Sequence, residues 1–91
     1  MDEIVYEWNE EKNTLLNNER NICFEDVVFA LKNDQLLDII LSPTHVDQKC
    51  FVVEIKEYAY VIPYVYVSSS KLFLKTIYAS RKYTKKLLKG K

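Results

Sequence analysis

The segment from Lys71 to Lys91 has eight basic residues and no acidic residue, although the whole chain has 13 of each. Positions 1 to 70 therefore hold five basic and 13 acidic residues, so the two segments carry formal charges of −8 and +8. A basic segment of this kind can bind a polyanion such as a nucleic acid, or an acidic protein. The alternative is a solvated helix face whose lysines have no specific partner.

Arg81 lies in this basic segment, directly after the last predicted strand. A guanidinium group at that position can reach across a sheet and donate two hydrogen bonds to a phosphate. At helical spacing, Tyr83 and Leu87 fall on one side, and the opposite side carries a group of lysines: Lys82, Lys85, Lys86 and Lys89. We therefore expect a helix that packs through Tyr83 and Leu87 and exposes its lysines.

The stretch "YAYVIPYVYV" places tyrosines on one side of a strand: Tyr58, Tyr60, Tyr64 and Tyr66. Small aliphatic residues on the other side suit a face covered by helices, so we expect the tyrosines to line an open face. Rings such as Tyr60 and Tyr64 could there stack on bases or clamp a partner helix. Alternatively they shield an exposed sheet. Pro63 lacks a backbone donor, which predicts an edge strand or a bulge.

Several kinds of chemistry are not indicated. The one glycine, Gly90, excludes a Gly-rich phosphate loop, and no motif surrounds the serines. The single histidine, His45, is expected to be an exposed loop residue, and the alternative is that it acts as an acid or base. Cys23 and Cys50 form no metal-ligand motif, so we expect reduced cysteines, no metal and no cofactor. The sequence shows no signal peptide and no apolar run of membrane-spanning length, which predicts a cytoplasmic protein.

The elements that must position these residues follow from periodicity. Asn9 before two glutamates predicts a helix over 10 to 19, and the spacing of apolar residues in "ICFEDVVFALKND" predicts another over 24 to 33. Four strand-like runs with short connections follow, and the chain ends in a helix over about 80 to 89, closed by Gly90. We predict a single α+β domain over 1 to 91. A curled antiparallel sheet of four to five strands carries two N-terminal helices on one face and a basic C-terminal helix.

The first helix has a thin apolar stripe. Trp8, Leu15 and Leu16 fall on one side, and Lys12 and Glu19 fall between them. Lys12 is therefore expected to point inward.

Three stretches resemble a known family in order and spacing. "YEWNEEKN", "ERNICFEDVVFAL" and "IYASRKYTKK" are similar to the W-[DN]-x-x-K-N, [IV]-x-F-E-[DE]-[AV] and S-x-R-[KR]-x-[ST]-x-[KR] blocks of BrnT-type toxins. These are RelE-like ribonuclease toxins of bacterial type II toxin-antitoxin modules. The resemblance implies a small RelE-like fold that cleaves RNA without metal. It also implies a co-encoded partner antitoxin with a ribbon-helix-helix DNA-binding domain, of the BrnA type.

The same resemblance implies the catalytic residues Lys12, Glu25 and Arg81. Where the family usually has Lys-His-Gly, this chain has Glu19, Arg20 and Asn21, so Arg20 could replace the charge of the missing histidine but not its titration. Attack by a ribose 2′-hydroxyl needs cations at the phosphate and groups that move protons. Glu25 or Glu19 could be the base.

The expected RNA-binding residues are Lys75, Lys82, Lys85, Lys86, Tyr60 and Tyr64. The leading hypothesis is a metal-independent endoribonuclease toxin. The alternative is a non-catalytic protein of the same fold, which pairs with a DNA-binding antitoxin, reaches the operator DNA only through it, and contributes to control of the operon.

Overall fold

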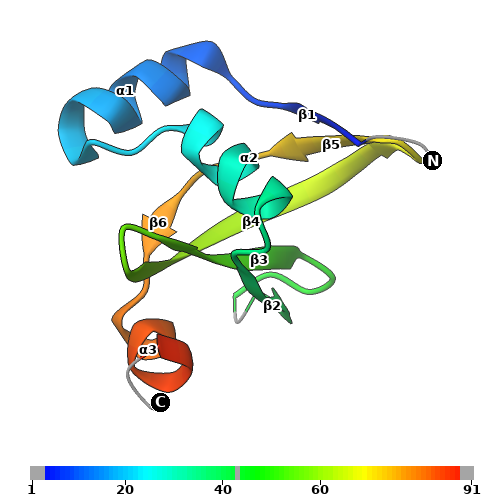
Figure 1. Ribbon diagram of the computed structural model, residues 1–91. Coiled ribbons are helices and arrows are strands. Elements are labelled where there is room, and N and C mark those ends of the chain that lie inside the picture. The colour runs from blue at the N-terminus through cyan, green and yellow to red at the C-terminus, as the bar shows by residue number, and fades with distance from the viewer. Residues whose placement is uncertain (1–3, 43, 89–91) are drawn as a thin grey trace.

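The computed structural model describes residues 4–42 and 44–88, and its first half follows the local signals of the sequence. Strand β1 (Val5–Glu7) leads into helices α1 (Glu10–Arg20) and α2 (Phe24–Lys32), which confirm the predicted ranges to within one residue (Figure 1). The Asn9 side chain caps α1 by accepting a hydrogen bond from the Lys12 amide at 2.9 Å. Asn21 ends α1 in the left-handed conformation, at φ 56°.

Five further strands complete a six-stranded sheet: β2 (Leu36–Leu41), β3 (Lys49–Ile55), β4 (Tyr58–Ser68), β5 (Lys71–Leu74) and β6 (Tyr78–Ala79). The order is β1-β5-β4-β3-β2, and β6 also pairs with β4. The α+β class and the helical layer are confirmed. The purely antiparallel sheet is wrong, because β1 runs parallel to β5. A parallel partner far along the chain leaves no local signal, since its crossover contains most of the molecule.

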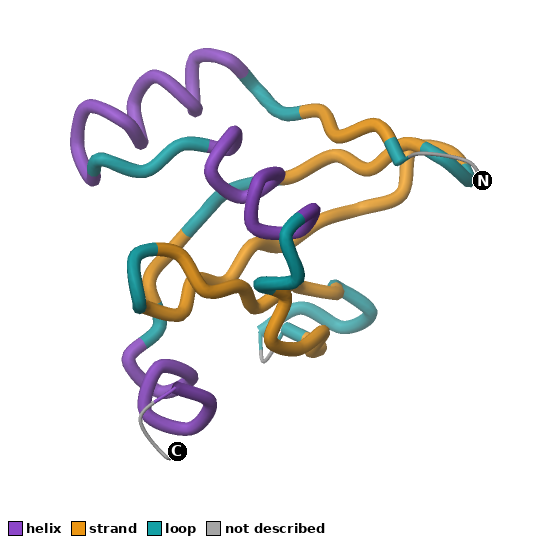
Figure 2. The backbone as a smooth tube through the Cα atoms, in the orientation of Figure 1, coloured by secondary structure: helices purple, strands orange, loops and turns teal. Residues whose placement is uncertain are grey.

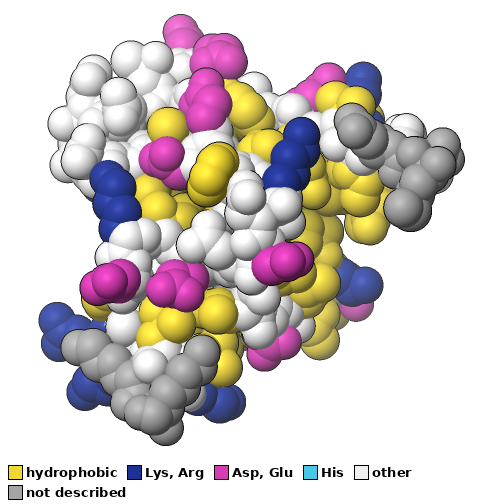
Figure 3. All heavy atoms as spheres, in the orientation of Figure 1, with side chains coloured by type: hydrophobic (Ala, Val, Ile, Leu, Met, Phe, Trp, Pro, Cys, Tyr) yellow, Lys and Arg dark blue, Asp and Glu magenta, His cyan; other side chains and the backbone are white. Residues whose placement is uncertain are grey.

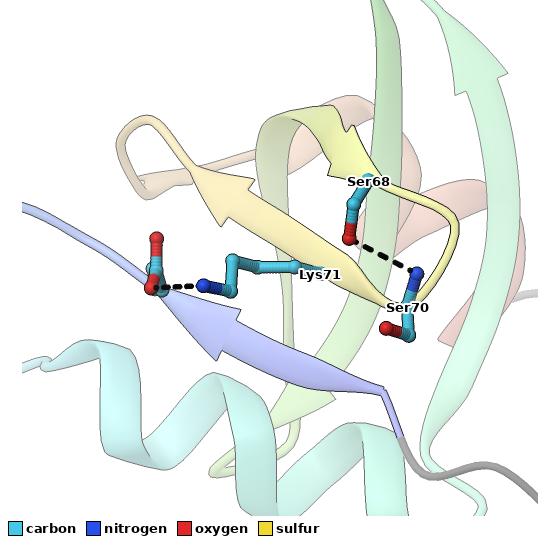
Figure 4. A network of polar contacts seen from close by, with 4 residues as sticks. Ser68, Ser70 and Lys71 are labelled. Atoms are coloured by element: carbon cyan, nitrogen blue, oxygen red, sulfur yellow. Dashed lines mark hydrogen bonds and ion pairs between the residues drawn. The ribbon is translucent and has the colours of Figure 1, made fainter.

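Polar contacts accompany this parallel pairing. The Val5 amide donates to the Ser70 carbonyl at 2.8 Å, and Lys71 Nζ lies 3.2 Å from Glu7 Oε2 on β1. Figure 4 shows the Lys71 side chain reaching from β5 to β1, beside the turn in which the Ser70 amide donates to Ser68 Oγ. Both partners of the ion pair are about half exposed, so the pair adds little stability. It is consistent with the register in which β1 pairs with β5.

Both faces of the sheet carry a hydrophobic cluster. The larger cluster lies under α1 and α2 and joins these helices to alternate residues of the strands, among them Phe24, Val27, Val53, Ile62, Leu72 and Leu74. The smaller cluster consists of Cys50, Val52, Ala59 and Val61, covered by Tyr83, Leu87 and Leu88 of the C-terminal segment. In Figure 1 this segment lies on the side of the sheet away from α1 and α2.

The predicted position of the tyrosines is wrong. Tyr60, Ile62 and Tyr64 do share one side of β4, but that side faces the core under α1 and α2. Tyr64 is 6% exposed and stacks on Phe51 with ring centroids 4.0 Å apart. The small residues Ala59 and Val61 instead leave room for the C-terminal segment to pack closely. Alternation along a strand predicts which residues share a side, and long-range packing decides which side is covered by which helix.

The edge position predicted from Pro63 is also wrong, because β4 is a central strand. The Pro63 carbonyl accepts a hydrogen bond from the Lys75 amide at 2.9 Å, but the proline has no N–H to donate in return. This is the point at which β5 ends and β6 has not yet begun. Figure 2 shows the loop that separates the two strands. The missing donor is therefore placed beside an interruption of the neighbouring strand.

The C-terminal segment begins as predicted and has an unusual form. A short helix α3 (Arg81–Tyr83) continues into a π-helical turn η1 (Thr84–Leu88), while the predicted end at Lys89 and Gly90 lies outside the described residues. Thr84 is 1% exposed, and its hydroxyl accepts from the Ala59 amide at 2.9 Å and donates to the Ser80 carbonyl at 2.7 Å. The packing of Tyr83 and Leu87 is confirmed. No helix in the described part of the chain is long and apolar enough to cross a membrane.

Candidate functional site

Two cavities share one lysine, Lys75. The first has a volume of about 490 Å³ and is called the α1 cavity; its lining residues are Asn9, Glu11, Lys12, Leu15, Phe73 and Lys75. The second has a volume of about 300 Å³ and is called the loop cavity; its lining residues are Ser42, Thr44, His45, Gln48, Pro63, Lys75, Thr76 and Tyr78. The structure thus brings together Lys12 and Lys75, two residues that the sequence predicted for RNA chemistry.

The position of Lys75 follows from the strand that precedes it. Leu72 and Leu74 point into the core under α1 and α2, so Phe73 and Lys75 point to the other side. Lys75 Nζ donates to Gln48 Oε1 at 2.9 Å. Gln48 Nε2 in turn donates to the carbonyls of Tyr64, at 2.7 Å, and of Lys49, at 2.9 Å. The ammonium group is therefore held at the boundary of the two cavities by a side chain that is itself anchored.

Lys12 does not point inward as predicted. It is exposed, and α1 packs on the sheet through Asn13 and Leu16. β1 ends at Glu7, which pairs with Phe73 of β5, and α1 begins three residues later. Lys12 thereby faces the same cavity as Lys75, together with the acidic Glu11. Because the ammonium group of Lys12 stays hydrated, folding does not have the free-energy cost of burying its charge.

Glu25 makes a structural contact at the junction of the two N-terminal helices. Asn13, 7% exposed, donates from Nδ2 to Glu25 Oε1 at 2.8 Å, and its Oδ1 accepts from the Phe24 amide at 2.7 Å. The hydrogen bond from Asn13 lowers the pKa of Glu25, since it stabilises the carboxylate. Asn13 was missed by sequence reasoning; its one signal is a polar residue three positions before Leu16 on the buried face.

Arg20, at the end of α1, also contacts the backbone of another element. Its Nη1 donates to the carbonyl of Ile77 at 3.2 Å, in the connection between β5 and β6. This contact ties the helix to the segment that lines the loop cavity. Neither of the two cavities that contain Lys75 has Arg20, Glu25 or Arg81 among its lining residues.

The basic residues of the C-terminal segment form a separate surface. The side chains of Arg81, Lys82, Lys85 and Lys86 are exposed. Lys82 Nζ lies 5.3 Å from the centre of the Tyr83 ring, a distance at which the ring attracts the cation. Figure 3 shows basic side chains around this segment and acidic side chains over the helical layer. In Figure 1, α1 and α3 lie at opposite ends of the molecule.

Gln48 was not predicted to take part in a site, and an acid or base role for His45 was only the alternative to an exposed loop residue. His45 is exposed and in a loop, as expected, but it also lines the loop cavity. That cavity is formed by the loop between β2 and β3, by β4, and by the chain from the end of β5 to the start of β6. Because these segments are far apart in the sequence, no residue spacing predicts the cavity. Within residues 4–42 and 44–88, no three side chains of His, Cys, Asp or Glu are grouped so that they could hold a metal ion.

The elements define a small α+β domain with an open, mixed sheet, two N-terminal helices on one side and a short basic segment on the other. No family model and no curated protein matches the sequence. Among solved structures, the chain matches the crystal structure of the ribonuclease toxin BrnT from Brucella abortus. The TM-score is 0.60 and the sequence identity 18%, over 88% of this chain and 97% of the toxin. The fold is therefore that of a BrnT-type toxin.

Proposed function

We propose that this protein is a ribonuclease toxin that cleaves RNA without a metal ion. The observation that carries the proposal is the BrnT fold, which extends over almost all of the matched toxin, combined with two lysines at one cavity of that fold. The sequence blocks that contain Lys12, Glu25 and Arg81 point to the same family. The cytoplasm, where RNA is available, is the corresponding location.

The reaction proposed is attack of a ribose 2′-hydroxyl on the adjacent phosphate. Negative charge accumulates on the phosphate oxygens in the transition state, and Lys12 and Lys75 face the space in which a phosphate could lie. The backbone of Lys12 lies in α1 and that of Lys75 directly after β5, and the Lys75 ammonium group is held by Gln48. Glu25 is better suited to positioning α1 against α2 than to accepting a proton, because Asn13 holds its carboxylate and lowers its pKa.

The basic surface of α3 and η1 is proposed to bind the RNA backbone outside the cleavage site. Its charged residues are exposed and none of them is needed to cover the small cluster, whose cover is Tyr83, Leu87 and Leu88. Arg81 lies at the first position of α3 and can donate two hydrogen bonds to one phosphate. The same surface would accept an acidic segment of the co-encoded ribbon-helix-helix antitoxin, so that RNA and antitoxin would compete for it.

A second candidate function has one specific observation in its favour. Glu25 and Arg20, two of the four residues expected to be catalytic, hold parts of the fold together through Asn13 and the Ile77 carbonyl. A protein that has lost catalysis could keep such contacts and act as the partner of a DNA-binding antitoxin in operon control. The two functions differ in whether the purified chain cleaves RNA.

The deciding experiment incubates the purified chain with single-stranded RNA in excess EDTA. We expect cleavage by the wild type. Lys12→Met and Lys75→Met should each lower the rate by about 10²-fold, since each removes one charge from the transition state. Lys32→Met, at the exposed end of α2, is the matched control and should cleave normally. Absence of cleavage by a folded wild-type chain that still binds its antitoxin would establish the non-catalytic function instead.

A further inference from the structure

The loop cavity contains the one histidine of the sequence, and the reaction proposed above still has no residue that takes the proton of the 2′-hydroxyl. His45 comes from the loop between β2 and β3 and Pro63 from β4. Lys75 and Thr76 come from the connection between β5 and β6, and Tyr78 from the start of β6. An imidazole and an ammonium group therefore line one space of about 300 Å³. Imidazole is the side chain best able to take up and release a proton near neutral pH.

The loop that carries His45 is held by hydrogen bonds on both sides. The Ser42 amide donates to the Gln48 carbonyl at 2.7 Å, which closes the loop. The Gln48 amide donates to the His45 carbonyl at 3.3 Å. Since the Gln48 side chain also accepts from Lys75 Nζ, at 2.9 Å, one residue links the backbone of His45 to the ammonium group of Lys75. The placement of the His45 backbone relative to the Lys75 ammonium group is thus set by the loop.

The space itself exists because the sheet is interrupted there. β5 ends at Leu74, opposite Tyr64, and β6 starts at Tyr78, opposite Val61. Pro63 lies between these two pairs and cannot donate to a neighbouring strand. A continuous strand would fill this region with backbone. The other titratable groups near His45 are Lys75 and Tyr78 in the cavity and Asp47 in the same loop. Burial raises the pKa of Tyr78, so its phenol stays protonated at neutral pH and can donate a hydrogen bond.

We infer that the phosphodiester that is cleaved in single-stranded RNA lies at Lys75, where the loop cavity meets the α1 cavity, and that His45 is the catalytic base of the reaction. This inference rests on the proposed ribonuclease function. Lys75 lines both cavities, so its charge can stabilise this phosphate. His45 lies in the cavity on one side of Lys75, and Lys12 lies in the cavity on the other side.

In the reaction, one imidazole nitrogen of His45 takes the proton of the 2′-hydroxyl while the bond between O2′ and phosphorus forms. The bond between phosphorus and O5′ breaks, and the leaving oxygen takes a proton from water. The hydroxide so formed accepts the proton of the imidazolium. The products are a 2′,3′-cyclic phosphate and a 5′-hydroxyl end, and no oxidant, reductant or further reactant is consumed.

The test measures single-turnover cleavage of single-stranded RNA as a function of pH, in EDTA, for the wild type and His45→Gln. Glutamine keeps the size and hydrogen-bonding capacity of the side chain but does not titrate. We expect the wild-type rate to fall in acid with the slope of one ionisation. The variant should lose about 10²- to 10⁴-fold in rate and show no such fall, with RNA affinity unchanged within about twofold. Val46→Ala, 92% exposed in the same loop, is the matched control.

A second variant protects the test from indirect effects. His45→Ala should regain part of its activity when free imidazole is added, because the base is then supplied from solution. Wild-type cleavage combined with an unchanged rate and acid limb in His45→Gln overturns this inference and leaves the proposed ribonuclease function standing. A slower variant that keeps the acid limb, or that imidazole does not rescue, overturns it as well. A folded wild-type chain that cleaves no RNA overturns both proposals.

Discussion

The two faces of the sheet are built from the same strands and have different tasks. Under α1 and α2, large side chains such as Phe24, Ile62 and Leu72 fill a closed core. On the other side, the C-terminal segment covers Cys50, Val52, Ala59 and Val61, and the loop cavity lies beside Pro63 of β4. The α1 cavity lies where α1 meets Phe73 and Lys75. One face supplies most of the hydrophobic stabilisation, and the other keeps polar groups available. Alternation along β4 and β5 is sufficient to separate the two.

The sharpest test of this division compares two tyrosines of β4. Tyr64 is 6% exposed and Tyr66 is 61% exposed, although they lie two residues apart on the same side of the strand. Tyr64→Ala should lower the free energy of unfolding by about 3–5 kcal/mol, because it empties a packed site and removes the stacking with Phe51. Tyr66→Ala should cost under about 1 kcal/mol. Urea unfolding measures both, and equal losses would show that the core does not extend to Tyr64.

The second test concerns the cover of the other face. Thr84→Val removes the hydroxyl that accepts from the buried Ala59 amide and leaves that donor without a partner. We expect a loss of about 1–3 kcal/mol in the free energy of unfolding. Thr14→Val, on the exposed side of α1, is the matched control and should stay within about 0.5 kcal/mol of the wild type. If the two variants unfolded at the same urea concentration, the hydroxyl would have no part in attaching the C-terminal segment.

The smallest effect is expected at the junction of α1 and α2. The lowered pKa of Glu25 means that its contribution to stability is present above the ordinary glutamate pKa of 4.5 and is lost as the pH falls through the lowered value. The stability difference between wild type and Glu25→Gln should therefore shrink in acid. The change should stay under about 0.5 kcal/mol, since the carboxylate is largely exposed. In an Asn13→Ala background this pH dependence should become smaller, because the hydrogen bond from Asn13 is the largest cause of the lowered pKa. Urea titrations at several pH values measure it, and a dependence as large as in the wild-type background would contradict the role of Asn13.

Much of this fold could be predicted from local signals. The cap at Asn9, the apolar spacing of α2 and the Tyr83–Leu87 stripe depend on neighbours within a few residues, and all three are confirmed. Lys12 was placed wrongly because the apolar stripe of α1 is thin, and Asn13 takes a buried position through its hydrogen bonds with Glu25 and Phe24. A polar residue that is buried by its partners cannot be recognised from a pattern of apolar residues.

The candidate site was less accessible to prediction, because long-range pairings assemble it. The sequence predicts charge at Lys12 and Lys75, but it does not show that the two face one cavity. The loop cavity depends on the interruption between β5 and β6 and on the folding of the loop between β2 and β3. The tyrosine side of β4 was recognised as a unit but assigned to the wrong face, since the sequence does not tell which helix will cover which side.

The parallel pairing of β1 with β5 has a consequence for how the protein is made. A ribosome releases the chain from its N-terminus, so Lys12 emerges long before Lys75. The α1 cavity needs residues 9–15 and 73–75, and β1 has no partner in the sheet until β5 has left the ribosome. Incomplete chains therefore lack the cavity even when their first helix has formed. Any activity that requires both lysines begins only after Lys75 has been synthesised and β5 has paired with β1.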